Sequence, residues 1–272
     1  MLSFMQPPMA RTISKRLICC LMTGLAGSVL FWCTAAWSQD SPTLTEALAQ
    51  ARESKLPEPV IIQALTNALE ADFDRSEAAR TLLVLAEAQR MDFDLASFQE
   101  RIAEGIAKRI AGARIAAALE ERLQRQILVS ERLKHARVAE GAAYQAAVAS
   151  LADGLEMGLA PQELDTLLQR SGDAPLAMTV VAAEMWALMK QLEVAPPLTD
   201  HLISEGLARR TLDPAWRHFP QVLVIARQKG VSDEDAVAQA LESLRTGGAP
   251  SDLLAGLGFT GRDLKTGPMM ND

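Results

Sequence analysis

The stretch IAEGIAKRIAGARI, residues 102–115, is the clearest guide to how this chain folds. Its pattern returns as LADGLEMGLAPQEL at 151–164 and as ISEGLARRTLDPAW at 203–216. When the three copies are aligned, one position near their end holds glycine, then proline, then aspartate followed by proline. These residue types commonly end or begin helices. The pattern therefore predicts the end of one helix, a tight turn and the start of the next helix.

Each copy of the pattern carries a glycine within its first helix, and these glycines are Gly105, Gly154 and Gly206. A glycine in a helix interior costs about 1 kcal/mol relative to alanine, so some feature of the fold has to offset that cost. We interpret the three glycines as structural positions at which a neighbouring helix approaches closely. The alternative is that each glycine opens a groove for a binding partner.

Composition and the spacing of turns both indicate an all-α fold. Apolar residues make up 49% of the 272 residues, but aromatic residues make up only 4%. The apolar fraction is dominated by alanine and leucine, which favour helices. Turn signals recur about every 19 residues, so a helical hairpin takes about 38 residues, which is the scale of stacked helical repeats. We predict about ten to twelve short antiparallel helices in an irregular helical-hairpin (solenoid-like) array.

Several helix starts are marked by capping residues. Thr43, followed by Glu46 three residues later, has the pattern of a capping box, and Asp74 and Asp94 stand where an N-cap is expected. The segment 113–150 is ambiguous, because its apolar stripe fits either one long helix or two helices with a break near His135 to Gly141. The sequence leaves these two alternatives open.

Charge is distributed unevenly along the chain. Residues 40–100 hold twelve acids and five bases, whereas residues 101–137 hold nine bases and four acids. One interpretation is that the two segments form solvated faces that attract each other within the fold. The other is that the basic segment forms a face for an acidic partner or for anionic membrane headgroups.

The first 38 residues have the organisation of an export signal. A basic segment ends at Arg16, an uncharged run covers 17–36, and small residues stand at the two positions that a signal peptidase reads, so cleavage is expected after Ser38. The alternative is that this segment stays as a membrane anchor, because about 20 apolar residues can span a bilayer. We expect a periplasmic or secreted protein or, in the alternative, one anchored in the inner membrane and facing the periplasm.

On this interpretation the chain has four parts. They are a signal segment at 1–38, an N-terminal helical-repeat half at 39–195, a C-terminal helical half at 196–257 and a disordered tail at 258–272. All three cysteines lie in the first part. The exported chain would therefore contain no cysteine, and packing alone would have to stabilise it.

We identify no catalytic residue, no cofactor site and no metal site in the sequence. The string GLGFTG at 256–261 matches a dinucleotide-binding pattern, but a helix is expected before it where the pattern needs a strand. None of the three histidines stands in a metal-binding motif. The formal net charge of −7 argues against nucleic acid as a partner, because phosphate binding needs clustered bases.

The main large aromatic residues of the second half are Trp186, Trp216 and Phe219. We consider them either anchors of the core or part of a partner-binding hot spot. The function that we predict is an exported, non-catalytic helical-repeat protein that acts as a protein-interaction or scaffold component of the periplasm or cell envelope. Its partner would be an unknown envelope protein, with membrane contact only through an uncleaved N-terminal segment. The alternatives are a carrier of a lipid-like apolar ligand between helices and a helical enzyme with an unrecognised site.

Overall fold

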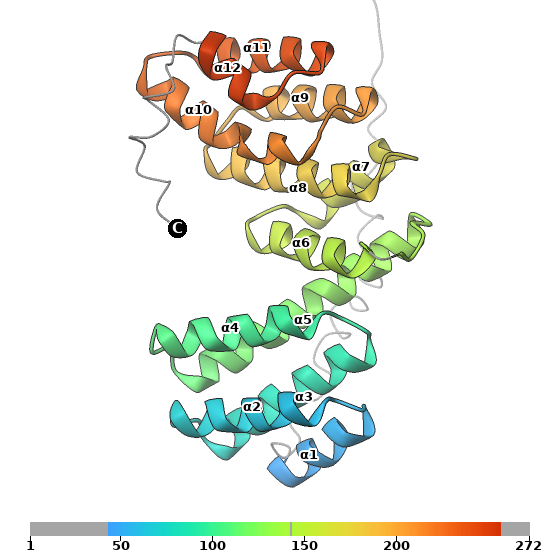
Figure 1. Cartoon of the computed structure of the whole chain (residues 1–272), viewed down its shortest axis with the longest axis vertical. Coiled ribbons are helices and arrows are strands. Elements are labelled where there is room, and N and C mark those ends of the chain that lie inside the picture. Colours follow the sequence, from blue (N-terminus) through green and yellow to red (C-terminus); the bar gives the residue numbers. More distant parts are fainter. Residues whose placement is uncertain (1–42, 142, 257–272) are drawn as a thin grey trace, which may run out of the picture. The chain divides into compact units, whose positions relative to one another are not determined.

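The computed structural model describes residues 43–141 and 143–256, and every structural statement below refers to them. These residues form twelve α-helices and one short 3-10 helix, without any strand (Figure 1). The prediction of an all-α fold is confirmed. The proposed signal segment at 1–38, the proposed tail at 258–272 and all of GLGFTG except its first glycine lie outside the described residues.

Short connections separate most of the helices. Their bounds are α1 (Leu44–Glu53), α2 (Glu58–Glu70), α3 (Arg75–Arg90), α4 (Leu95–Ala107), α5 (Gly112–His135), α6 (Tyr144–Glu156), α7 (Pro161–Ser171), α8 (Leu176–Gln191), α9 (Pro196–Arg209), η1 (Pro214–His218), α10 (Phe219–Gln228), α11 (Asp233–Thr246) and α12 (Pro250–Gly256). The ambiguous segment 113–150 thus holds two helices, α5 and α6.

The predicted helix starts are confirmed. At α1, the Thr43 hydroxyl accepts a hydrogen bond from the Glu46 N–H at 3.3 Å, and the Glu46 carboxylate accepts one from the Thr43 N–H at 2.9 Å. Asp74 caps α3 in the same reciprocal way, and Asp94 caps α4 through the N–H two residues later. These bonds satisfy N–H groups that have no partner within their own helix.

Most of the helices end with the same turn, and α4 illustrates it. The N–H of Ile110 donates to the carbonyl of Gly105 at 2.9 Å, and the N–H of Arg109 donates to the carbonyl of Ile106 at 2.9 Å. Arg109, the donor of the second bond, has a φ of 54°, in the left-handed region. This pair of bonds is the Schellman motif. The equivalent longer bond also closes α1, α2, α3, α5, α6, α8, α9, α10 and α11.

The residue after the left-handed one is apolar at most of these ends and turns into the protein. The buried examples are Leu56, Phe93, Leu159 and Val194. At most of these ends the next residue or two then start the following helix, whereas after α5 the next helix begins at Tyr144. Each such joint therefore consists of a left-handed residue, an apolar anchor and a helix start, which together reverse the chain within a few residues.

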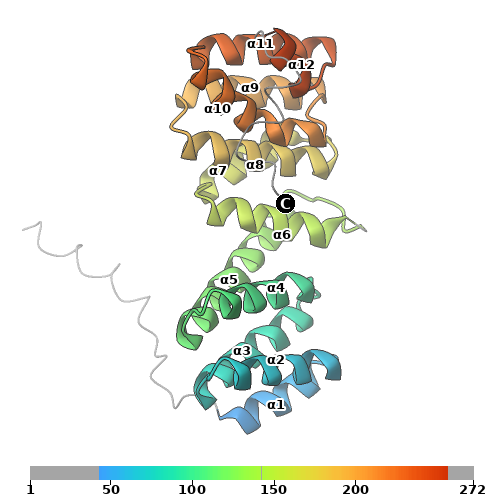
Figure 2. The same cartoon turned by 60° about the vertical axis from the view of Figure 1, so that its left-hand side comes forward.

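Helices two apart in the sequence pack against each other through much of the described chain. The principal pairs of this kind are α1 with α3, α3 with α5, α2 with α4, α6 with α8, α7 with α9, and α9 with α11. The pattern shifts at α5, which also packs on α6, and α8 contacts both α9 and η1. The order of the helices can be followed in two views (Figures 1 and 2).

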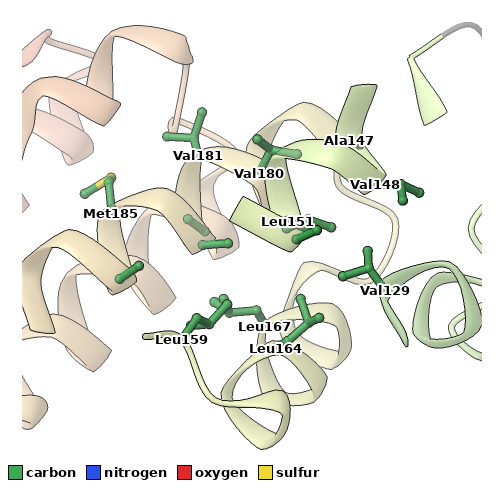
Figure 3. Close-up of a cluster of buried hydrophobic side chains, with 14 of the residues drawn as sticks. Val129, Ala147, Val148, Leu151, Leu159, Leu164, Leu167, Val180, Val181 and Met185 are labelled. Atoms are coloured by element: carbon green, nitrogen blue, oxygen red, sulfur yellow. The ribbon is translucent and has the colours of Figure 1, made fainter. Parts of the chain in front are cut away.

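One connected set of buried apolar side chains runs from α1 to α12. Figure 3 shows a part of it, where Val129 of α5, Leu151 of α6, Leu164 of α7 and Val181 of α8 contribute to the core. The predicted boundary between residues 195 and 196 lies at an ordinary joint, and α8 contacts α9 across it. The division into two halves stays a prediction.

Candidate interaction surfaces

The three repeated glycines occupy the same position in three Schellman turns. The carbonyls of Gly105, Gly154 and Gly206 accept the closing hydrogen bonds of α4, α6 and α9, at 2.9 to 3.0 Å. All three glycines are buried. The corresponding position of α1, α2, α3 and α10 holds alanine. The position therefore favours small residues, and glycine is only the residue type that is easiest to recognise there in the sequence.

The space beside the glycines differs among the three copies. A Cβ added to Gly105 would lie 2.8 Å from the side chain of Ile115 in α5, and one added to Gly206 would lie 2.6 Å from Leu212. A Cβ on Gly154 would meet its nearest neighbour at 3.8 Å, which is an ordinary contact. The expected close approach of a helix is present at Gly105. At Gly206 it comes from the connecting segment, and at Gly154 there is no tight contact.

The candidate hot-spot aromatics lie mainly in the core. Trp216 in η1 and Phe219 at the start of α10 are fully buried, and their ring centroids are 6.0 Å apart. This is the placement expected of core anchors. Trp186 on α8 is half-buried, so it is the one member of the three with appreciable exposed surface. A role in partner binding stays a prediction.

The acids that directly precede the repeated glycines form ion pairs. We did not predict these acids as interacting residues from the sequence. Glu104 accepts from Lys108 at 2.5 Å, Asp153 from Arg122 at 2.5 Å, and Glu205 from Arg209 at 2.6 Å. Hydrogen bonds from Lys108 and Arg209 hold the pKa values of Glu104 and Glu205 below the ordinary value. The signal was visible as the strings AEG, ADG and SEG in the three copies.

The best-formed ionic cluster joins α4, α5 and α6. The guanidinium of Arg122 is buried, donates to Asp153 and lies 5.9 Å from the centre of the Phe98 ring. Glu156 accepts from Arg101 at 2.9 Å and from Arg125 at 3.1 Å. A cleft of about 320 Å³ opens beside this cluster, lined by Ser97, Glu100, Arg101, Glu104, Arg122 and Asp153. Acids and bases both line the cleft, so it has no strong charge preference.

This cluster bears on the interpretation of the charge blocks. The arginines of α5 pair mainly with acids of later helices, as in Arg122 with Asp153 and Arg132 with Asp165. Arg80 with Glu120 is an ion pair between the two predicted blocks, and there the base lies in the acidic block. Five of the nine bases of the basic segment thus form ion pairs within the fold, although not with the segment that we expected.

Another cleft lies between α1 and α3. It has a volume of about 760 Å³ and is lined by Glu46, Ala49, Gln50, Glu53, Ser54, Lys55, Ala86, Glu87, Gln89 and Arg90. Glu87 pairs with Arg90, and Glu46 is held by the Thr43 cap. Most of its charged groups thus serve local structure, and we assign no ligand to this cleft.

Within residues 43–141 and 143–256 there is no cluster of three or more histidine, cysteine or acidic side chains able to hold a metal ion. The three histidines are exposed. Carboxyl groups with a shifted pKa are all shifted downward, chiefly by hydrogen bonds from basic side chains or, at Glu46, from the Thr43 cap. In the same residues we find no helix both long and apolar enough to cross a membrane.

The most exposed apolar surface is on α2. Ile62 and Leu69 are 57% and 81% exposed, and their spacing of seven residues places them on one side of the helix. Leu65 lies between them and is half-buried. We call Ile62, Leu65 and Leu69 the α2 stripe. Sequence reasoning missed it, because the same helix also carries a buried apolar side.

Comparison of the chain with protein-family models, with curated proteins and with solved structures finds no match.

Proposed function

We propose that this chain is an exported, non-catalytic helical-repeat protein that serves as an interaction or scaffold component of the periplasm or cell envelope. One observation carries the proposal. The same joint recurs between successive helices, and these helices pack two apart along the chain. A chain built in this way adds one similar unit after another.

Such a construction favours binding surfaces over enclosed sites. In a solenoid-like array each unit contacts mainly its neighbours, so the array grows in one direction and presents long faces to partners. Binding proteins of this kind use the surface that stacking creates, whereas the joints serve the fold. The exposed α2 stripe is a feature of the described surface that fits this role.

The proposed location rests on the pattern of residues 1–38. If the segment is an export signal, native protein from the envelope fraction begins near Gln39, and N-terminal sequencing will read QDSPT first. A protein that starts at Met1 and sediments with inner membranes would replace this proposal by the anchored alternative. A protein that starts at Met1 and stays in the cytoplasm would contradict export altogether.

Crosslinking in intact cells tests the interaction role. The protein, tagged at its C-terminus, is crosslinked, purified under denaturing conditions and analysed by mass spectrometry for proteins and for extractable lipids. An untagged strain is the control for background. The proposal expects a specific envelope protein in near-equimolar yield. A bound lipid without a protein partner would favour the carrier alternative, and recovery of neither would contradict the scaffold function.

A further inference from the structure

Three large apolar side chains are notably exposed in the described part of the chain: Ile62, Leu69 and Ile110. Two of them belong to α2. An adjacent side of α2, with Ile61, Ala64 and Ala68, already anchors the helix to the core, and half-buried Leu65 packs against that core as well. The exposed Ile62 and Leu69 are therefore not needed to hold the helix in place. Covering a large apolar side chain is worth about 1.5–3 kcal/mol, so the stripe offers binding energy that folding leaves unused.

The charged residues of α2 itself and of the turn that follows it are all acidic. Glu58 stands at the start of α2, Glu70 at its end and Asp72 in the turn that follows, and there is no lysine or arginine from residue 58 to residue 74. Glu58 pairs with Arg52 of α1 at 3.9 Å, and because both side chains are exposed this interaction is weak. Both ends of the stripe are thus acidic.

This charge pattern disfavours a second copy of the chain as the occupant. Two α2 helices side by side in antiparallel order would bring Glu58 of one copy to Glu70 of the other. In parallel order each acid would face its own counterpart. Like charges at the rim of an apolar contact oppose association, whereas opposite charges support it and set its orientation.

We propose that the α2 stripe docks an amphipathic helical segment of a partner protein that has lysine or arginine on both sides of its apolar face. From Ile62 to Leu69 the stripe is about 10 Å long, or two helical turns, which matches apolar residues at positions i, i+3 or i+4, and i+7 of the partner. A contact of this size gives weak binding, with a Kd on the order of micromolar. This inference rests on the proposed interaction function and names the partner's chemistry.

Two designed peptides of about 18 residues test the charge requirement. Both carry leucine at i, i+4 and i+7, one with lysine and the other with glutamate at the flanking positions. Fluorescence anisotropy with the full chain is expected to show that the lysine peptide binds about tenfold more tightly or better. Its binding should weaken as salt is raised, because exposed charges are screened. Equal binding of the two peptides would overturn the proposal.

Substitutions on the protein test the place of docking. Ile62→Gln combined with Leu69→Gln should weaken binding of the lysine peptide about tenfold. Ile110→Gln makes the same chemical change at an exposed residue outside α2 and is expected to leave binding unchanged. Glu58→Gln with Glu70→Gln should reduce the preference for lysine over glutamate. All these side chains are exposed, and circular dichroism verifies that the variants fold.

Two further outcomes would refute the inference. One is a weakening by Ile110→Gln equal to that of the α2 variants. The other is a dimer in sedimentation velocity that dissociates when Ile62 and Leu69 are changed, which would make a second copy the occupant. Neither result touches the envelope crosslinking, so a partner captured there by an α2 variant would leave the proposed function standing.

Discussion

Gly105, Gly154 and Gly206 stand at the same position of three helix ends but have different surroundings. A side chain at this position would point toward apolar residues that begin the next unit. At Gly105 that neighbour is Ile115. Where that neighbour lies within 3 Å of the missing Cβ, only glycine fits without a shift. Where it lies farther away, glycine gives no packing advantage and keeps its cost in helix propensity.

We predict opposite effects for the same substitution in these copies. Gly154→Ala should raise the free energy of unfolding by up to about 1 kcal/mol, because the new methyl makes only ordinary contacts. Gly105→Ala and Gly206→Ala should lower it by about 1–3 kcal/mol, because the methyl overlaps buried Ile115 and Leu212. Urea unfolding of the three variants measures this, and a common sign would refute the packing account.

The helix ends could be predicted from the sequence only in part. Glycine marked three of the joints, but the alanines at the same position of α1, α2, α3 and α10 carry no signal in an alanine-rich chain. The left-handed residues are equally hidden. Lys55, Glu193 and Arg109 adopt positive φ, although their side chains do not favour it. The closing hydrogen bonds and the buried apolar residue that follows impose that conformation.

At the scale of the helices, ion pairs connect α4, α5 and α6. Arg122 is buried and has only 6% of its side chain exposed, whereas its partner Asp153 is 43% exposed. The two ends of this pair are therefore unequal. Removing the acid leaves a buried cation, but removing the base leaves a carboxylate that water can reach.

We predict that Asp153→Asn lowers the free energy of unfolding by about 2 kcal/mol or more, because Arg122 then loses its closest anion. Arg122→Leu should cost less, since leucine can pack against Phe98 and Asp153 becomes hydrated. Asp165→Asn is the matched control, because its partner Arg132 has 40% of its side chain exposed and stays hydrated without the acid, so this pair should contribute under about 1 kcal/mol. Thermal or urea unfolding compares the three, and equal losses for both asparagine variants would contradict this account.

Taken across the described chain, contacts pass from helix to helix without an interruption at the predicted boundary near residue 195. The described residues cluster as one compact unit, and the apolar core includes residues from α1 to α12. Long helical arrays can nevertheless lose cooperativity, because each unit depends mainly on its neighbours. Cooperativity is therefore the property that distinguishes one unit from two halves.

We expect the helices on both sides of that boundary to unfold together. Hydrogen exchange measured by mass spectrometry in increasing urea should show peptides from α3 and from α11 losing protection at the same urea concentration. The physical reason is that α8, α9 and η1 share buried contacts, so neither side keeps its core when the other opens. Two separated transitions, divided near Ala195, would support two halves.

The sequence by itself determined the helical class, the helix starts at Thr43, Asp74 and Asp94, and the joints marked by glycine. These features depend on hydrogen bonds between residues a few positions apart, so their pattern is readable in a single stretch. Tertiary structure alone decided that Trp216 and Phe219 are covered, that Ile62 and Leu69 are not, and that Arg122 pairs with Asp153. Apolar sides of helices look alike in sequence. Only the placement of the neighbouring helices determines which side is buried and which is left exposed.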